Sequence, residues 1–131
     1  EDELEGVRLG MREALMNAIE HGNLEISFEQ KTEATERGQL LELLRRRQQD
    51  AVLSARRVTV DYDFDGKRVE YVISDEGPGF DYAAMEARNI RAAEEIFRKH
   101  GRGIALARAM FDEVKYEGRG NQVRLSKRLH P

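Results

Sequence analysis

The spacing of hydrophobic residues predicts a long amphipathic helix near the start of the chain, over residues 3–21. Apolar side chains recur there at steps of three and four residues, which places them on one helix face. They are Val7, Met11, Ala14, Leu15, Ala18 and Ile19. Gly22 and Asn23 follow and are expected to end this helix as a C-terminal cap.

Further along, alternating apolar and polar residues predict a β-hairpin. Residues 57–64 and 67–74 are expected to pair through a turn at Asp65-Gly66, with Val58, Val60, Tyr62 and Phe64 on one face. We expect this antiparallel pair to be central in a sheet. The other elements expected are a helix over 35–51, one or two short helices within 81–100, a helix over 104–111, and strands over 113–116 and 122–127. Residues 24–30 fit a strand or a loop equally well.

This order of elements predicts an α+β fold: a two-layer sandwich whose mixed, mostly antiparallel sheet is covered on one face by helices. With 131 residues, the chain is long enough for a single domain with its own core. Because it opens inside a helical pattern, we expect it to be a fragment of a longer protein.

Composition narrows the function classes. The chain has no cysteine, which excludes disulfides and cysteine metal sites. The 22 basic and 25 acidic residues are interspersed, so no broad basic face is expected for nucleic acid. No apolar run approaches the roughly 20 residues of a membrane span, and no signal peptide is visible. We expect a cytoplasmic protein with no membrane partner.

The most informative stretch is Asp75-Glu-Gly-Pro-Gly79, which follows the apolar strand directly. It brings one carboxylate and bare glycine backbone to the end of the sheet, where a ligand could approach closely. By itself it is also compatible with an ordinary turn.

A second pattern lies on the first helix. Glu13, Asn17 and His21 are four residues apart and share one side of it, within about 80° of arc. A solvated face would have the same spacing. A carboxylate can act as a general base, however, and an amide oxygen suits Mg²⁺.

A third pattern is Gly101-Arg-Gly103 before a helix. Glycines at a helix start let backbone N–H groups converge on an anion, although a flexible helix entry has the same sequence. The preceding residues 81–100 have a thin apolar face and a basic end, which fits either a segment that moves or a docked surface helix.

In combination and in this order, the three motifs resemble the ATP-binding domain of the Bergerat-fold (GHKL) family. This family includes sensor histidine kinases, type II topoisomerases, MutL-like repair proteins and anti-sigma factor serine kinases. Residues 13–23 and 101–114 are most similar to the anti-sigma serine kinase branch.

The resemblance implies roles for the motif residues. Asp75 would accept a hydrogen bond from the adenine amino group, and Gly77 and Gly79 would let the backbone approach the base and sugar. Asn17 would ligate Mg²⁺, and Glu13 would be the general base toward a serine hydroxyl of a protein substrate.

The resemblance also implies a phosphate site and an ATP lid. Residues 81–100 would form the lid. The terminal phosphates of ATP would be held by the backbone of the second glycine motif and by basic side chains; the residues concerned are Arg98, Lys99, Gly101, Arg102, Gly103 and Ile104.

The activity that the resemblance implies is transfer of the γ-phosphate to an antagonist protein in a partner-switching pathway. A sigma factor is a second candidate partner, and a homodimer is a candidate assembly. The extra helix between residues 23 and 57 departs from the pattern of compact anti-sigma kinases and puts the sigma-binding role in doubt. Two alternatives stay open: a nucleotide-sensing module without phosphotransfer, and the catalytic domain of a sensor histidine kinase.

Overall fold

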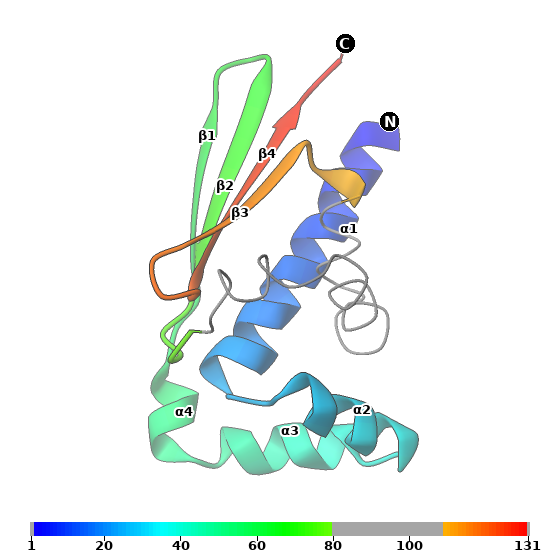
Figure 1. Cartoon of the computed structure of the whole chain (residues 1–131), viewed down its shortest axis with the longest axis vertical. Coiled ribbons are helices and arrows are strands. Elements are labelled where there is room, and N and C mark those ends of the chain that lie inside the picture. Colours follow the sequence, from blue (N-terminus) through cyan, green and yellow to red (C-terminus); the bar gives the residue numbers. More distant parts are fainter. Residues whose placement is uncertain (1, 80–108, 131) are drawn as a thin grey trace, which may run out of the picture.

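The computed structural model describes residues 2–79 and 109–130, which form an α+β sandwich of two layers (Figure 1). One layer is a long helix, α1 (Asp2–Asn17), which continues directly as the π-helix η1 (Ala18–Asn23). The other layer is a sheet of β1 (Thr59–Phe64), β2 (Arg68–Ser74), β3 (Glu113–Glu117) and β4 (Gln122–Arg128). The strands lie in the order β1-β2-β4-β3, and every neighbouring pair is antiparallel.

The core forms where α1 packs on the sheet. It contains Val7, Ala14 and Ala18 from the helical layer, Ile73 and Leu125 from the two central strands, and Phe111. The helix approaches Phe111 closely, because a Cβ added at Gly10 would stand only 2.6 Å from the Phe111 ring. Most of the predicted apolar face is therefore buried or partly buried, but Ile19 is 45% exposed.

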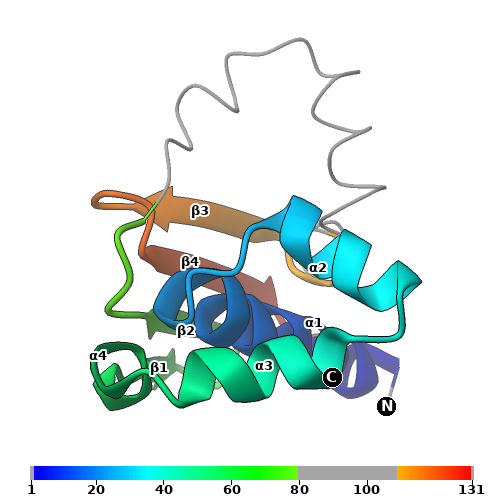
Figure 2. The same ribbon diagram turned by 90° about the horizontal axis from the view of Figure 1, so that it is seen from below.

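Three short helices connect η1 to β1: α2 (Phe28–Glu36), α3 (Leu40–Gln48) and α4 (Ala51–Ala55). We call residues 28–55 the helical arm. It lies across one end of both layers, as the view from below shows (Figures 1 and 2). Ser27 begins it with a capping box, in which its hydroxyl and the side chain of Gln30 each accept the other residue's backbone N–H.

Three predictions about these elements are wrong. The helical layer ends at Asn23, as expected, but Gly22 and Asn23 do not cap it, since both lie within η1 and the C-cap is Leu24. The helix expected over 35–51 is interrupted, because Gly38 takes a positive φ of 67° between α2 and α3. The hairpin of β1 and β2 forms, with Phe64 paired to Val69, but in the sheet that the described residues form β1 is an edge strand and only β2 is central.

Candidate functional site

A cavity of about 390 Å³ lies between the end of the helical layer and the sheet, a size typical of small-molecule sites. Its walls combine apolar core residues with a few polar side chains. The lining residues are Ala14, Asn17, Ala18, His21, Gly22, Glu25, Ile26, Ser27, Phe28, Ile73, Asp75, Pro78, Gly79, Val114, Tyr116, Gly120, Asn121, Gln122, Val123 and Leu125.

Asp75 stands at the end of β2 and is fixed by its neighbours. Its backbone N–H donates to the carbonyl of Asn121 (2.9 Å), and the Asn121 side chain donates back to the Asp75 carbonyl (3.0 Å). Its carboxylate oxygen Oδ1 accepts the backbone N–H of Gly77 at 2.8 Å. Partial burial raises the pKa of this carboxyl above its ordinary value, although the Gly77 N–H and the cations Arg119 and Arg56 oppose that shift.

The glycines of this loop are required by close contacts. A Cβ at Gly77 would overlap the carbonyl group of Gly22, and one at Gly22 would come within 2.5 Å of Asp75 Oδ2. Gly79 has a φ of 79°, and a Cβ there would overlap the Arg119 carbonyl. The loop of residues 75–79 thus packs tightly between η1 and the β3–β4 turn. Only glycine allows such close packing at positions 22, 77 and 79.

The β3–β4 turn supplies two loop contacts that the sequence did not reveal. Arg119 Nη2 donates to the Gly77 carbonyl at 3.1 Å, and Asn121 bonds Asp75 as described. In the sequence, residues 118–121 indicated only a turn. One sequence feature could have indicated these contacts. If the last strand pairs antiparallel with β2, its first residue lies beside the end of β2, and the turn before it then lies next to Asp75.

The helical wall brings Asn17 and His21 to the cavity, together with Ala14 and Ala18. Glu13 lies on α1 one turn before Asn17, but among the described residues it does not line the cavity. His21 Nδ1 is 2.5 Å from the carbonyl oxygen of Ile26, so this nitrogen carries the proton. Burial lowers the pKa of His21, which favours the neutral ring.

The segment that enters the helical arm forms a further wall, which was not predicted. Phe28 packs beside the His21 ring with centroids 4.0 Å apart, and Ile26 and Ser27 line the same cavity. Glu25, also a lining residue, takes a positive φ of 52°. The Glu25 carboxylate accepts a hydrogen bond from Arg56 at 2.6 Å, and its backbone N–H donates to the Gly22 carbonyl at 3.3 Å.

Several predicted site residues lie outside the described residues. These are the lid segment 81–100, with Arg98 and Lys99, and the phosphate motif with Gly101, Arg102, Gly103 and Ile104. The helix expected over 104–111 is seen only at Ala109 and Met110.

The parts of the chain that the structure describes hold no cluster of three or more histidine, cysteine or acidic side chains suited to a metal ion. Asn17 is one of several lining residues with a side-chain oxygen, and an amide oxygen suits a hard cation that draws its other ligands from phosphate and water. Within residues 2–79 and 109–130, no helix combines the length and the hydrophobicity needed to cross a membrane.

Comparison with known proteins agrees with this geometry. Residues 1–127 match the family model of the histidine kinase-like ATPase domain. Searches of curated proteins and of solved structures found no match. The match extends over nearly the whole chain, and the chain therefore belongs to the histidine kinase-like ATPase domain family.

Proposed function

We propose that this chain is the ATP-binding domain of a protein serine/threonine kinase of the anti-sigma type, with Asp75 as the residue that recognises adenine. Family membership supports ATP as the ligand. The observation that carries the proposal is the cavity at the end of β2, where Asn121 holds the backbone of Asp75 and the Gly77 N–H orients its carboxylate.

Base selection follows from the chemistry of that carboxylate. Oδ1 already accepts the Gly77 N–H, and no hydrogen-bond donor of the described residues is assigned to Oδ2. Oδ2 would accept from the exocyclic amino group of adenine. Guanine carries a carbonyl oxygen at that position, so two acceptors would face each other without a proton between them. The site would therefore favour ATP over GTP.

The remaining roles concern the phosphates and are part of the same proposal. Asn17 would offer its amide oxygen to Mg²⁺, which when bound neutralises phosphate charge. The backbone of residues 101–104, with Arg102 and basic side chains such as Lys99, would hold the terminal phosphates, and residues 81–100 would close over them as a lid.

In the transfer step, the hydroxyl oxygen of a serine or threonine on the protein substrate attacks the γ-phosphorus of ATP. The bond from that phosphorus to the β,γ-bridging oxygen breaks, ADP leaves, and the hydroxyl proton passes to the Glu13 carboxylate. Phosphoryl transfer of this kind depends mainly on positioning and charge neutralisation. The protein substrate would be an antagonist in a partner-switching pathway, with a sigma factor as a further partner.

Two measurements test the two halves of the proposal. Calorimetric titration with ATP, ADP and GTP should show adenine-specific binding, and Asp75→Asn should weaken ATP binding about 10- to 150-fold, the loss of a hydrogen bond to a charged group. Glu13→Gln should retain ATP binding but slow phosphotransfer to an antagonist protein about 10²- to 10⁴-fold. Equal affinity for GTP and ATP would refute the role of Asp75.

A second function is supported by the position of Glu13, which lies beside the lining residues rather than among them. In that case the domain would sense nucleotide and change its affinity for a partner without phosphotransfer. Regulation by the intact protein would then survive Glu13→Gln and be lost in Asp75→Asn. The kinase hypothesis predicts loss in both variants.

A further inference from the structure

One buried polar side chain beside the cavity has no role in the proposed function so far. Asn23 is the last residue of η1, and only 4% of it is exposed. It does not belong to the described residues that line the cavity. Removing an amide from water costs free energy unless its hydrogen bonds are replaced. The partners of Asn23 should therefore explain why an asparagine stands at this position.

Asn23 binds the backbone next to Asp75. Its side-chain oxygen Oδ1 accepts the backbone N–H of Glu76 at 2.7 Å. That N–H belongs to the peptide group between Asp75 and Glu76, whose carbonyl oxygen accepts the side chain of Asn121 at 3.0 Å. Two asparagine side chains thus hold one peptide group, one at its N–H and one at its C=O. Because a peptide group is planar, hydrogen bonds on its two opposite edges restrain the orientation of the whole plane.

The orientation of this plane decides where the Asp75 carboxylate points. The preceding peptide group is held as well, since the Asp75 N–H donates to the Asn121 carbonyl at 2.9 Å. With a restrained peptide plane on each side, φ and ψ of Asp75 are restrained, and so is the direction of its Cα–Cβ bond. The Gly77 N–H then holds the carboxylate through Oδ1. Without Asn23, the plane that follows Asp75 would be held at its carbonyl oxygen alone.

The bond between Asn23 and Glu76 joins two segments that are each held by the end of the helical arm. The Asn23 carbonyl accepts a hydrogen bond from the guanidinium group of Arg56 at 2.9 Å. The Glu76 carboxylate accepts the backbone N–H of Arg57 at 2.6 Å. Asn23 is therefore anchored on the protein side, and it can restrain the loop that carries Asp75.

We propose that Asn23 is a positioning residue for adenine recognition, which sets the direction of the Asp75 carboxylate by holding the peptide group that follows it. The inference rests on the proposed role of Asp75. Asn23 acts without touching the nucleotide: it restrains the loop before ATP arrives, so that binding does not have to select one loop orientation among several. An aspartate would do the same, because its carboxyl oxygen accepts the same N–H, whereas alanine and leucine offer no acceptor.

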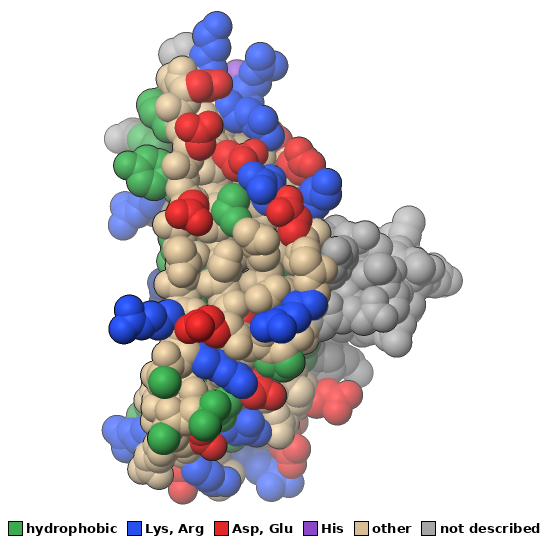
Figure 3. Space-filling model, turned by 90° about the vertical axis from the view of Figure 1, so that its left-hand side faces the viewer, with side chains coloured by type: hydrophobic (Ala, Val, Ile, Leu, Met, Phe, Trp, Pro, Cys, Tyr) green, Lys and Arg blue, Asp and Glu red, His purple; other side chains and the backbone are tan. Residues whose placement is uncertain are grey.

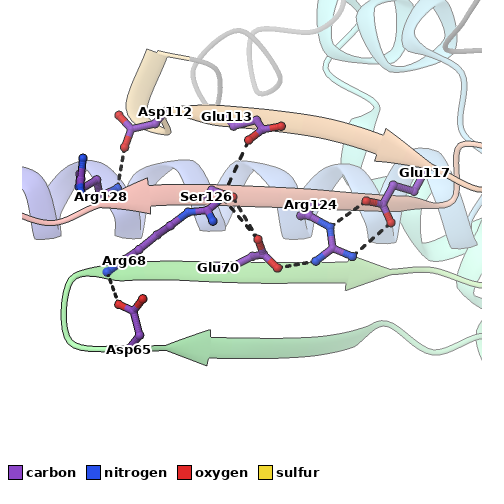
Figure 4. A network of polar contacts seen from close by, with 9 residues as sticks. All are labelled: Asp65, Arg68, Glu70, Asp112, Glu113, Glu117, Arg124, Ser126 and Arg128. Atoms are coloured by element: carbon purple, nitrogen blue, oxygen red, sulfur yellow. Dashed lines mark hydrogen bonds and ion pairs between the residues drawn. The ribbon is translucent and has the colours of Figure 1, made fainter.

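A second buried polar side chain, far from this loop along β2 and β4, provides a control. Ser126 is 2% exposed and lies on the face of the sheet away from α1, since its neighbour Leu125 belongs to the core. It accepts a hydrogen bond from Arg68 at 2.8 Å and donates to Glu70 at 3.4 Å, within a network of charged side chains (Figure 4). Seen from the left-hand side of Figure 1, the upper half of the molecule carries interspersed acidic and basic side chains (Figure 3). Ser126→Ala thus removes a buried polar group that lies outside the described cavity wall.

The test compares ATP with purine riboside triphosphate, in which hydrogen replaces the exocyclic amino group. Calorimetric titration of the parent chain should show about 10- to 150-fold tighter binding of ATP, the contribution of one hydrogen bond to a charged group. Asn23→Ala should reduce this preference on the order of tenfold, because ATP binds more weakly while the affinity for the analogue changes little. Asn23→Asp should retain the parent's preference. A residue with a merely structural role would weaken the binding of both nucleotides equally.

Ser126→Ala should lower the melting temperature and leave the preference for ATP unchanged. If Asn23→Ala does not fold, Asn23→Leu takes its place, because leucine fills the space without supplying an acceptor. Equal weakening of both nucleotides in that variant, or loss of the preference in Asn23→Asp, would overturn the proposal. A parent chain without any preference for ATP over the analogue would instead refute the role of Asp75, and the role of Asn23 would fall with it.

Discussion

Replacing Gly22 by alanine probes the contact between the helical layer and the proposed adenine site. Gly22 lies within η1, and its backbone conformation suits alanine, so only the space around a new Cβ is at issue. That Cβ would stand 2.5 Å from Oδ2 and 2.6 Å from Oδ1 of Asp75, well under the 3.0 Å that real Cβ atoms keep.

The clash falls on a side chain that can rotate, so we expect the fold to survive and the site to fail. Overpacking costs about 1–3 kcal/mol, whereas alanine gains up to about 1 kcal/mol over glycine in a helix. The free energy of unfolding should therefore fall by no more than about 3 kcal/mol. If Asp75 turns away, it loses the Gly77 N–H and its orientation toward adenine. The loss of one hydrogen bond to a charged group corresponds to about 10- to 150-fold weaker ATP binding.

The assay pairs calorimetric titration with ATP and a thermal denaturation curve. Gly6→Ala is the matched control, because it also adds a methyl group to the helical layer. There the new Cβ meets only the flexible Met110 side chain, with its sulfur at 3.0 Å. The control should bind ATP like the parent. Parent-like ATP affinity in Gly22→Ala would refute the argument that this glycine exists to accommodate the Asp75 carboxylate.

Four further predictions follow from contacts and pKa shifts. Asn121→Ala removes the hydrogen bond to the Asp75 carbonyl and should lower the free energy of unfolding by about 1–3 kcal/mol, which urea denaturation would measure. The same variant should also bind ATP more weakly. Arg124→Met leaves Glu70 and Glu117 facing each other and should lower the melting temperature, less so in high salt, because salt screens that repulsion. Because burial lowers the His21 pKa, the unfolded chain binds more protons below the ordinary histidine value of about 6.5. The free energy of unfolding should then fall as the pH falls below about 6.5. His21→Gln should make the free energy of unfolding less dependent on pH in this range. Because the pKa of Asp75 is raised, acidification should protonate its carboxylate and weaken ATP binding at a pH above the ordinary aspartate value of about 3.9, which a titration series across pH would reveal.

Most of the fold could be predicted from local sequence patterns. The periodic apolar face of α1, the alternation of β1 and β2 and the turn between β3 and β4 each depend on nearby residues, and all were predictable. The position of β1 was not, because strand order depends on which strands pair across the chain. The pairing of β2 with β4 joins residues that are 48 (Ser74 with Gln122) to 60 (Arg68 with Arg128) positions apart.

The candidate site likewise has residues that the sequence indicated and residues that it did not. Asp75 and the glycines after it were recognisable as a motif. The spacing of Asn17 and His21 put them on one side of the helix without distinguishing a site from a solvated face, the family resemblance singled out Asn17 alone, and both residues line the cavity. Asn121, Ile26 and Phe28 reach the cavity only through tertiary packing, and Arg119 reaches the Gly77 carbonyl in the same way. Arg47 lies in the triplet Arg45-Arg-Arg47, a pattern that by itself indicates a solvated helix face. Its guanidinium donates to the carbonyl groups of Leu24 and Glu25.

The helical arm leaves the domain and returns to it at almost the same place. Arg56, one residue beyond the end of α4, donates to the carbonyl of Asn23 (2.9 Å) and to the carboxylate of Glu25 (2.6 Å), just before the arm begins. A segment whose two ends are tied together can change in length at little entropic cost to the rest of the fold. Evolution could therefore lengthen, shorten or replace the part of this arm that follows Phe28 among related proteins, while the cavity that Phe28 lines kept its shape.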